Sequence, residues 1–225
     1  MDQKKNSNRP YDSIIFDLDG TLLNTLHDLR DAVNHVLENH GYPSRRLEEI
    51  RGFVGNGIYQ LMMRAVPKNT LEHDLNLAFQ EFKEYYTSHC RVKTKPYEGV
   101  LELLQYLKDN GYKTAIVSNK NDAAVKELVQ IYFKGLIDVS LGQREGIRIK
   151  PASDAVIEAM KLLGTDATKA LYVGDSEVDM ETAKNAAMDY VLVDWGFRHR
   201  DQLEELNPMK IISQSHQLIQ YLTDK

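Results

Sequence analysis

Hydrophobic positions along this chain form two kinds of pattern that alternate over most of its length. Short apolar runs at 13–16, 114–117 and 170–173 are typical of buried strands, whereas longer stretches repeat apolar residues at helical spacing. The same patterns predict strands at 139–141, 190–193 and 210–212, and helices at 98–110, 121–132, 151–163, 177–187 and 214–223. Alternation of this kind indicates an α/β fold whose parallel sheet is covered by helices on both faces.

The segment 24–91 is different, because it stays helical in character and offers no good strand. Its apolar spacing predicts one helix from Thr25 to about Gly41 and further helices at 46–52, 56–66 and 69–88. We therefore expect a Rossmann-like three-layer core with an inserted all-helical cap domain. The expected boundaries are a flexible tail at 1–10, a discontinuous core at 11–23 and 92–225, and the cap at 24–91.

Polar side chains follow the predicted strands at the points where those strands end. The clusters are Asp17 and Asp19, Ser118 and Asn119, Lys150 before Pro151, and Asp175 with Asp179. Because the carboxyl ends of parallel strands meet at one edge of a sheet, these side chains are expected to converge. Several carboxylates in one place repel one another unless a cation is bound, and oxygen ligands favour Mg²⁺.

The converging residue types suggest transfer of a phosphoryl group. A carboxylate such as Asp17 can attack phosphorus, while Asp19 protonates the leaving alkoxide and later activates water. Lys150, Ser118 and a metal held by Asp175 would neutralise the transferred group. Each motif alone has an ordinary structural explanation as a turn, a helix cap or a solvated lysine, so the prediction depends on their joint occurrence. An acidic calcium-binding loop also remains an alternative for the first motif.

The four motifs together resemble the haloacid dehalogenase superfamily over nearly the whole chain. They read Asp17-Leu18-Asp19-Gly20-Thr21, Ser118-Asn119, Lys150-Pro151 and Gly174-Asp175-Ser176-x-x-Asp179. The resemblance implies that Asp17 is the nucleophile and a Mg²⁺ ligand, and that Asp19 is the general acid/base and binds the metal through its backbone carbonyl. It also implies that Asp175 is a metal ligand and that Asp179 acts on the metal indirectly. Thr21, Ser118, Asn119 and Lys150 would contact the substrate.

Within that superfamily, the inserted segment resembles the helical cap of phosphoglycolate-phosphatase-like members. The resemblance lies in the run from Arg51 to Gly57, and it makes Arg51, Gly55 and Asn56 candidate substrate contacts. An ordinary turn between two cap helices is the alternative. Asn24 departs from the pattern, because many relatives carry an aspartate there, and its effect stays open.

The resemblance implies a Mg²⁺-dependent phosphatase for small phosphorylated metabolites, with 2-phosphoglycolate as the first substrate to consider. A pyrophosphatase or a broad sugar-phosphate phosphatase is the alternative within the family. A regulatory or metal-binding module that keeps the fold is the alternative outside enzymes.

Composition narrows the class of protein further. The formal net charge of −5 argues against a nucleic-acid partner, and no apolar run approaches the length of a membrane span. The single cysteine, Cys90, excludes an internal disulfide and fits a reducing compartment. We therefore expect a cytoplasmic protein, as a monomer or a homodimer.

Overall fold

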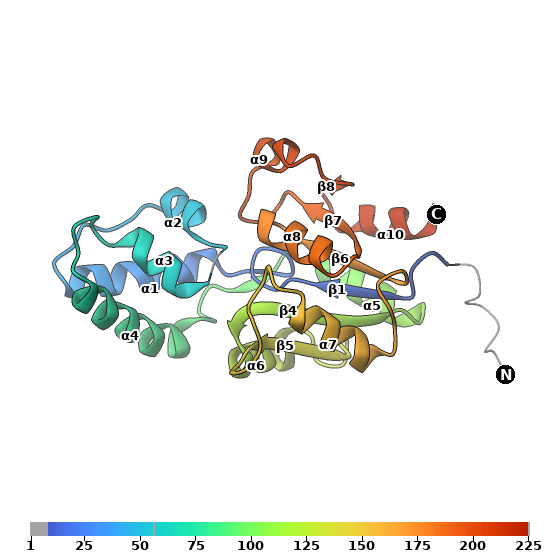
Figure 1. Ribbon diagram of the computed structural model, residues 1–225, viewed down its shortest axis with the longest axis horizontal. Coiled ribbons are helices and arrows are strands. Elements are labelled where there is room, and N and C mark those ends of the chain that lie inside the picture. The colour runs from blue at the N-terminus through green and yellow to red at the C-terminus, as the bar shows by residue number, and fades with distance from the viewer. Residues whose placement is uncertain (1–8, 56, 225) are drawn as a thin grey trace. The chain divides into compact units, whose positions relative to one another are not determined.

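The protein is described by a computed structural model covering residues 9–55 and 57–224 (Figure 1). The chain divides into two compact units. One comprises Met1–Leu22 and Pro96–Lys225, and the other comprises Leu23–Lys95. Two short strands, β2 (Leu23–Asn24) and β3 (Lys95–Pro96), pair with each other where the chain enters and leaves the second unit.

The first unit is built on a six-stranded sheet in the order β5-β4-β1-β6-β7-β8. Every neighbouring pair whose register is resolved is parallel. The strands are β1 (Ser13–Phe16), β4 (Lys113–Asn121), β5 (Val139–Gln143), β6 (Ala170–Gly174), β7 (Asp189–Val193) and β8 (Ile211–Ile212). The predicted parallel α/β core is therefore confirmed.

Helices cover the sheet because its strands are apolar on both faces. They are α5 (Val100–Asp109), α6 (Asp122–Tyr132), α7 (Asp154–Leu163), α8 (Glu177–Asn185), α9 (Arg200–Glu205) and α10 (His216–Thr223). On one face, Ile15 and Val117 belong to a single core cluster with residues of α7 and α8 such as Val156 and Ala183. Since side chains alternate along a strand, the buried Ile14 and Phe16 belong to the opposite face.

The strand order creates a topological switch point at β1. The chain runs from β1 outward through β4 and β5, and then crosses to β6, β7 and β8 on the other side of β1. In open sheets of this kind, ligands bind beyond the carboxyl ends of the strands at such a point. The fold therefore directs attention to the residues that follow β1, β4 and β6.

The second unit consists of four helices and strand β2 together with part of β3, among the residues that the structure describes. The helices are α1 (Leu26–Asn39), α2 (Leu47–Phe53), α3 (Ile58–Ala65) and α4 (Glu72–His89). This unit extends to Lys95 instead of ending at residue 91. The reason is Asp28 in α1, whose buried carboxylate accepts the backbone N–H groups of Lys93 and Thr94 at 2.9 Å each.

Further differences from the sequence prediction concern short segments and the start of the described chain. Helix α9 and the two-residue strands β2 and β3 had no counterpart in the predicted pattern. Of the tail expected at 1–10, residues 1–8 lie outside the described part. Arg9 is anchored, since its guanidinium donates to the Asn110 carbonyl at 2.7 Å and lies 4.7 Å from the centre of the Tyr112 ring.

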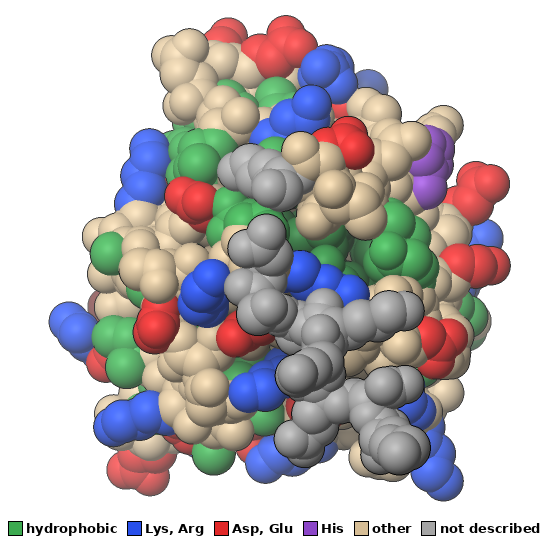
Figure 2. Space-filling view, turned by 90° about the vertical axis from the view of Figure 1, so that its right-hand side faces the viewer, with side chains coloured by type: hydrophobic (Ala, Val, Ile, Leu, Met, Phe, Trp, Pro, Cys, Tyr) green, Lys and Arg blue, Asp and Glu red, His purple; other side chains and the backbone are tan. Residues whose placement is uncertain are grey.

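The surface in Figure 2 shows basic and acidic side chains interspersed on the face turned toward the viewer. No patch of a single charge dominates the described residues of that face. Across the described residues, every helix is too short or too polar to cross a bilayer.

Candidate active site

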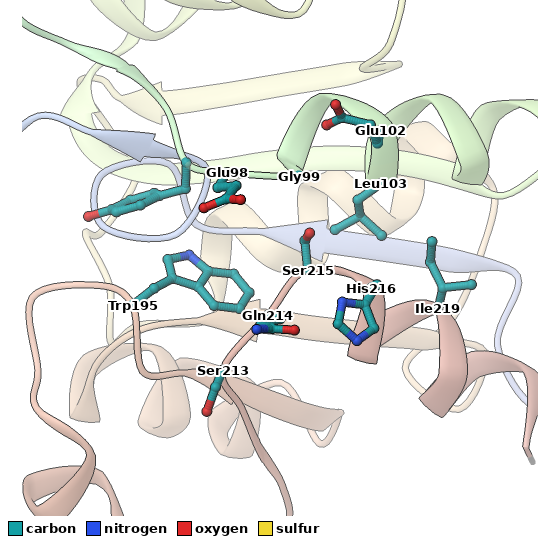
Figure 3. Close-up of a pocket in the computed structure, with 11 residues that line it drawn as sticks. Glu98, Gly99, Glu102, Leu103, Trp195, Ser213, Gln214, Ser215, His216 and Ile219 are labelled. Atoms are coloured by element: carbon teal, nitrogen blue, oxygen red, sulfur yellow. The ribbon is translucent and has the colours of Figure 1, made fainter.

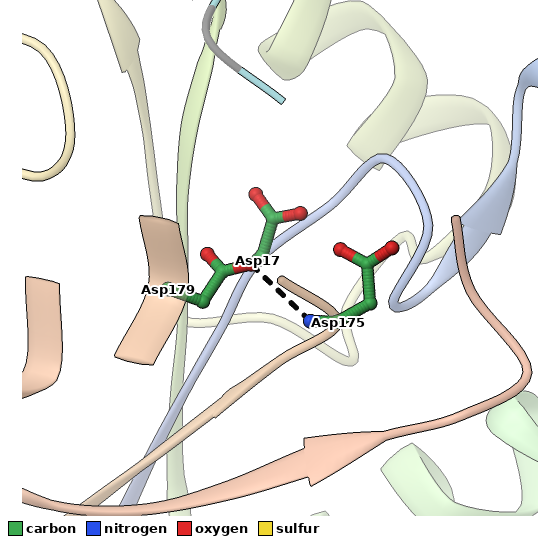
Figure 4. A group of neighbouring side chains, drawn as sticks. All are labelled: Asp17, Asp175 and Asp179. Carbon is green, nitrogen blue, oxygen red and sulfur yellow. Dashed lines mark hydrogen bonds between the residues drawn. The ribbon is translucent and has the colours of Figure 1, made fainter. Parts of the chain in front are cut away.

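Three buried carboxylates meet at the carboxyl ends of β1 and β6. Asp17 directly follows β1, Asp175 directly follows β6, and Asp179 lies in the first turn of α8. One oxygen from each of the three lies within 4.8 Å of the others, and the exposed fraction of each residue is 6% or less. Figure 4 shows the three side chains grouped together, with the Asp175 N–H donating to Asp179 Oδ2 at 3.2 Å.

Glycines allow the segments that carry the three carboxylates to approach one another closely. Gly20 has a φ of +96°, and a Cβ at that position would lie 2.3 Å from Asp175 Oδ2. A Cβ on Gly174 would lie 2.3 Å from the Cβ of Asp179. Both distances are far below van der Waals contact, so an alanine at either position would push a carboxylate out of the cluster. The glycines of the first and fourth motifs thus have a steric explanation.

Asp179 has both oxygens engaged by protein donors. Its Oδ1 accepts from Lys150 Nζ at 2.7 Å and from the Tyr172 hydroxyl at 3.1 Å. Its Oδ2 accepts from the Ser176 hydroxyl at 2.6 Å and from the Asp175 N–H. With both oxygens bonded in this way, Asp179 is expected to orient its neighbours, which is the indirect role that the resemblance implies.

Asp17 and Asp175 each keep one oxygen for another partner. Asp17 Oδ1 accepts from Lys150 Nζ at 2.6 Å, and Asp175 Oδ2 accepts from the Phe197 N–H at 2.6 Å. The described residues supply no hydrogen-bond donor to Asp17 Oδ2 or Asp175 Oδ1. Burial raises the pKa of Asp17 to about 7 despite the opposing charge of Lys150, with Asp179 adding to the rise. Burial, together with Asp179 and Asp17, also holds the pKa of Asp175 well above its ordinary value.

These features fit a hard divalent cation. Two buried carboxylates with an available oxygen each, and pKa values raised by burial and mutual repulsion, form a donor set that a cation would stabilise. Asp17 and Asp175 would supply the carboxylate ligands, and Asp179 would hold Asp175 and Lys150 in place.

Lys150 lies at the centre of the buried network. Its ammonium donates to Asp17, to Asp179 and to the Tyr172 hydroxyl, the last at 3.2 Å. Burial opposes its positive charge, but Asp17 and Asp179 outweigh that effect and raise the pKa of Lys150 well above its ordinary value. Lys150 is therefore a permanent cation beside the proposed nucleophile.

The second motif positions two polar side chains on β4. The Ser118 hydroxyl is buried and accepts the Lys120 N–H at 3.2 Å, which leaves its own proton free to donate. The Asn119 carboxamide bonds both backbone groups of Lys150, accepting its N–H at 2.8 Å and donating to its carbonyl at 3.1 Å. Asn119 therefore positions the lysine, and a contact with substrate stays a prediction for it.

Thr21 is 1% exposed, and its hydroxyl has no hydrogen-bond partner among the described residues. Its backbone carbonyl accepts the Trp195 indole N–H at 3.0 Å, which fixes the loop that carries Asp17 and Asp19. A buried hydroxyl without a partner is compatible with the substrate contact predicted for Thr21.

Two functional candidates were missed by sequence reasoning, Lys120 and Tyr172. Lys120 Nζ lies 3.0 Å from Asp19 Oδ1 and 3.3 Å from Asp19 Oδ2. Side chains two residues apart on a strand share a face, so its spacing from Ser118 was the available signal. Tyr172 lies in the middle of an apolar strand, where nothing in the sequence distinguishes its hydroxyl from an ordinary core residue.

The candidate contacts of the helical unit form a separate group. Arg51 is in α2 and pairs with Glu48 at 3.4 Å, and Gly55 has a φ of +127° in the turn that follows. Asn56 lies outside the described residues. Asn24 accepts the Leu26 N–H at 3.4 Å at the start of α1, which gives this position a structural part. Substrate contact by Arg51, Gly55 and Asn56 stays a prediction.

A cavity of about 540 Å³ in the first unit is lined by none of the clustered carboxylates. Figure 3 shows Trp195 on one side of it and Ser215 and His216 on another, with Glu102 and Leu103 contributed by α5. Its lining residue Trp195 donates to the Thr21 carbonyl, as described above.

Comparison with known proteins identifies the family. Residues 14–193 match the model of the haloacid dehalogenase-like hydrolases, and the chain belongs to that family. The resemblance drawn from the four motifs is thus confirmed.

Individual relatives are phosphatases by name. A Mesorhizobium japonicum "Phosphoglycolate phosphatase" is 35% identical over 210 residues, covering 89% of each chain. An Aquifex aeolicus protein with the same name is 30% identical over 185 residues, covering 82% of this chain and 85% of the relative. Among solved structures, a "putative phosphoglycolate phosphatase" from Lactobacillus delbrueckii subsp. bulgaricus aligns with a TM-score of 0.91 at 35% identity, over 95% of this chain and 98% of that one. The predicted fold class and hydrolytic class are confirmed.

Proposed function

We propose that this protein is a Mg²⁺-dependent phosphatase that hydrolyses small phosphate monoesters, with 2-phosphoglycolate as its substrate. The observation that carries the proposal is the buried group of Asp17, Asp175 and Lys150. Both carboxylates have an oxygen available to a cation, and Lys150 donates a hydrogen bond to Asp17, the proposed nucleophile. The names of the relatives support the choice of 2-phosphoglycolate.

Asp17 performs the first displacement in this proposal. One of its carboxylate oxygens attacks phosphorus, the bond between phosphorus and the ester oxygen breaks, and Asp19 gives a proton to the departing alkoxide. The product of this step is a phosphoryl group bound to Asp17. In the second step Asp19 takes a proton from water, the water oxygen attacks phosphorus, and inorganic phosphate leaves while the Asp17 carboxylate is restored.

The remaining residues stabilise charge on the phosphoryl oxygens. Asp17, Asp175 and the Asp19 carbonyl would hold Mg²⁺, which would supply positive charge to those oxygens. Lys150 donates to the same oxygens, and Ser118 and Thr21 offer hydroxyl protons. Asp179 and Asn119 hold Lys150 from its two ends, at the ammonium and at the backbone.

Selection of the substrate is assigned in part to the helical unit. Arg51, Gly55 and Asn56 are proposed to contact the end of the metabolite away from phosphorus, as their motif suggests. We also propose a cytoplasmic location, because Cys90 is a single free thiol.

The proposal is tested by measuring phosphate release from 2-phosphoglycolate, pyrophosphate, a panel of sugar phosphates and p-nitrophenyl phosphate, each with Mg²⁺ and with EDTA. We expect turnover that requires Mg²⁺ and is fastest with 2-phosphoglycolate. A preference for pyrophosphate or a sugar phosphate would contradict only the choice of substrate. Absence of turnover on every compound would contradict the enzyme and leave a regulatory or metal-binding module.

The covalent route is tested by Asp17→Asn, since an amide is a poor nucleophile. Its kcat should fall by several orders of magnitude. The matched control is Asp201→Asn, because Asp201 is exposed in α9 and its substitution should leave kcat unchanged. Retention of substantial activity by Asp17→Asn would exclude an intermediate on Asp17.

A further inference from the structure

A second lysine, Lys120, lies beside Asp19 and has no role in the function proposed above. Its ammonium is 3.0 and 3.3 Å from the two oxygens of Asp19, and its side chain is only 7% exposed. Withdrawing an ammonium from water is costly, so a lysine this well buried needs a compensating negative partner. Asp19 is such a partner in the structure, and its side chain is 18% exposed.

The position of Lys120 follows from the work proposed for Asp19. Asp19 must reach the ester oxygen to protonate it, so the cation that touches Asp19 lies on the leaving-group side of the site. Lys150 is bonded instead to Asp17 and Asp179. The two lysines therefore pair with different carboxylates, Lys150 with the proposed nucleophile and Lys120 with the proposed acid.

The backbone keeps Lys120 in place. Its N–H donates to the Ser118 hydroxyl at 3.2 Å, and both residues lie in the last part of β4, where the pairing with β5 is irregular between Val117 and Asn121. The bond to Ser118 fixes the backbone of Lys120, and the ion pair with Asp19 fixes its ammonium.

We propose that Lys120 is a specificity-determining residue that binds negative charge on the leaving group, and that it selects monoesters whose ester carbon carries a carboxylate. In such a molecule the carboxylate is attached to the carbon that bears the ester oxygen, so Asp19 and Lys120 can serve the two groups together. Lys120 then exchanges one oxygen of Asp19 for the carboxylate of the substrate, which frees Asp19 to protonate the ester oxygen. A neutral sugar leaving group offers Lys120 no such exchange.

This inference rests on the proposed function and assigns part of its substrate selection to the sheet unit. Pyrophosphate also has an anionic leaving group, so the test must separate a carboxylate from a phosphate. It must also separate recognition of the substrate from mere support of Asp19.

The experiment compares kcat/KM for 2-phosphoglycolate and for its amide analogue, which has the same shape without the carboxylate charge. For Lys120→Met we expect at least a tenfold loss on 2-phosphoglycolate and less than a threefold loss on the amide, because only the acid loses a charged partner. Lys120→Arg should keep part of the preference for the acid. The matched control is Lys126→Met, since Lys126 is an exposed lysine on α6 that pairs with Asp122 and should change neither value.

Equal losses on the acid and the amide would overturn the inference and leave Lys120 as a positioning residue for Asp19. Unchanged values on both would overturn it as well. A selective loss on pyrophosphate, with 2-phosphoglycolate unaffected, would contradict the carboxylate class. If Lys120→Met does not fold, Lys120→Gln gives the same comparison with a polar side chain. Failure of the proposed function is distinct, because the unmodified protein would then hydrolyse none of these compounds.

Discussion

The acidic cluster should make the metal-free protein less stable than its Asp17→Asn variant. Asp17 is buried, and its pKa is raised from 3.8 to about 7. Asn resembles the protonated acid in shape and charge, so Asp17→Asn removes the cost of holding an ionised carboxylate there. The difference between 3.8 and about 7, at roughly 1.4 kcal/mol per pKa unit, corresponds to about 4 kcal/mol.

The sign of the pH dependence follows from the same two values. A carboxyl whose folded pKa is raised binds its proton more tightly in the folded state, so deprotonation weakens the fold. The penalty is absent below about pH 4, grows between pH 4 and 7, and is complete above about pH 7. Asp17→Asn should therefore be more stable than the unmodified protein in EDTA at pH 8, and the gap should close toward pH 5.

Mg²⁺ should reverse this order, because a ligand stabilises the form that binds it. The assay is urea unfolding at pH 5, 6, 7 and 8, in EDTA and in saturating Mg²⁺, for the unmodified protein, Asp17→Asn and the exposed control Asp201→Asn. In Mg²⁺ the unmodified protein should gain much more free energy of unfolding than Asp17→Asn. If Asp17→Asn were the less stable protein in EDTA at pH 8, the account of a strained acidic cluster would be refuted.

Three further substitutions test the parts that surround the cluster. Tyr172→Phe should lower kcat about tenfold and the free energy of unfolding by about 1–3 kcal/mol, because the buried hydroxyl no longer bridges Lys150 and Asp179. Steady-state kinetics and urea unfolding measure the two effects, and an unchanged kcat would exclude a positioning role. Gly20→Ala should abolish Mg²⁺ binding measured by calorimetry, because its Cβ would overlap Asp175; normal affinity would contradict the steric argument. Asn119→Ala should reduce kcat at least tenfold with folding retained, since the Lys150 backbone loses both hydrogen bonds to the Asn119 carboxamide. A rise in KM alone would instead indicate direct contact with substrate.

The sheet could be predicted from the sequence because its strands are buried on both faces and read as continuous apolar runs. β1, β6 and β7 were expected within one residue of their observed bounds. Helix α9 was not expected, since its six residues are mostly charged and too few to show a helical period. The end of the helical unit at Lys95 depends on Asp28, which lies more than 60 residues earlier and gives no local signal.

The meeting of the motif residues was predictable where polar residues stand at strand ends, and less so where a residue fits its local pattern. Asp17 and Asp175 directly follow apolar strands, and Lys150 precedes Pro151, so their positions stand out in the sequence. Tyr172 resembles its apolar neighbours in β6, and only the structure shows its hydroxyl between Lys150 and Asp179. A side chain whose role depends on a partner 22 residues away leaves no mark in its own segment.

Charge balance shows what the missed lysine changes. The motifs in the sequence contribute four carboxylates and one lysine, with a formal charge of −3. The structure adds Lys120, so the formal charge of these side chains becomes −2. The carboxylates are Asp17, Asp19, Asp175 and Asp179. A single divalent cation neutralises that sum, which is the condition for burying such a cluster at modest cost. With the metal bound, an anionic substrate would meet two lysines that are each already paired with a carboxylate. Each lysine can then exchange one carboxylate for one end of the substrate. In the proposed mechanism both exchanges free a protein carboxylate, Asp17 for the attack on phosphorus and Asp19 for protonation of the ester oxygen.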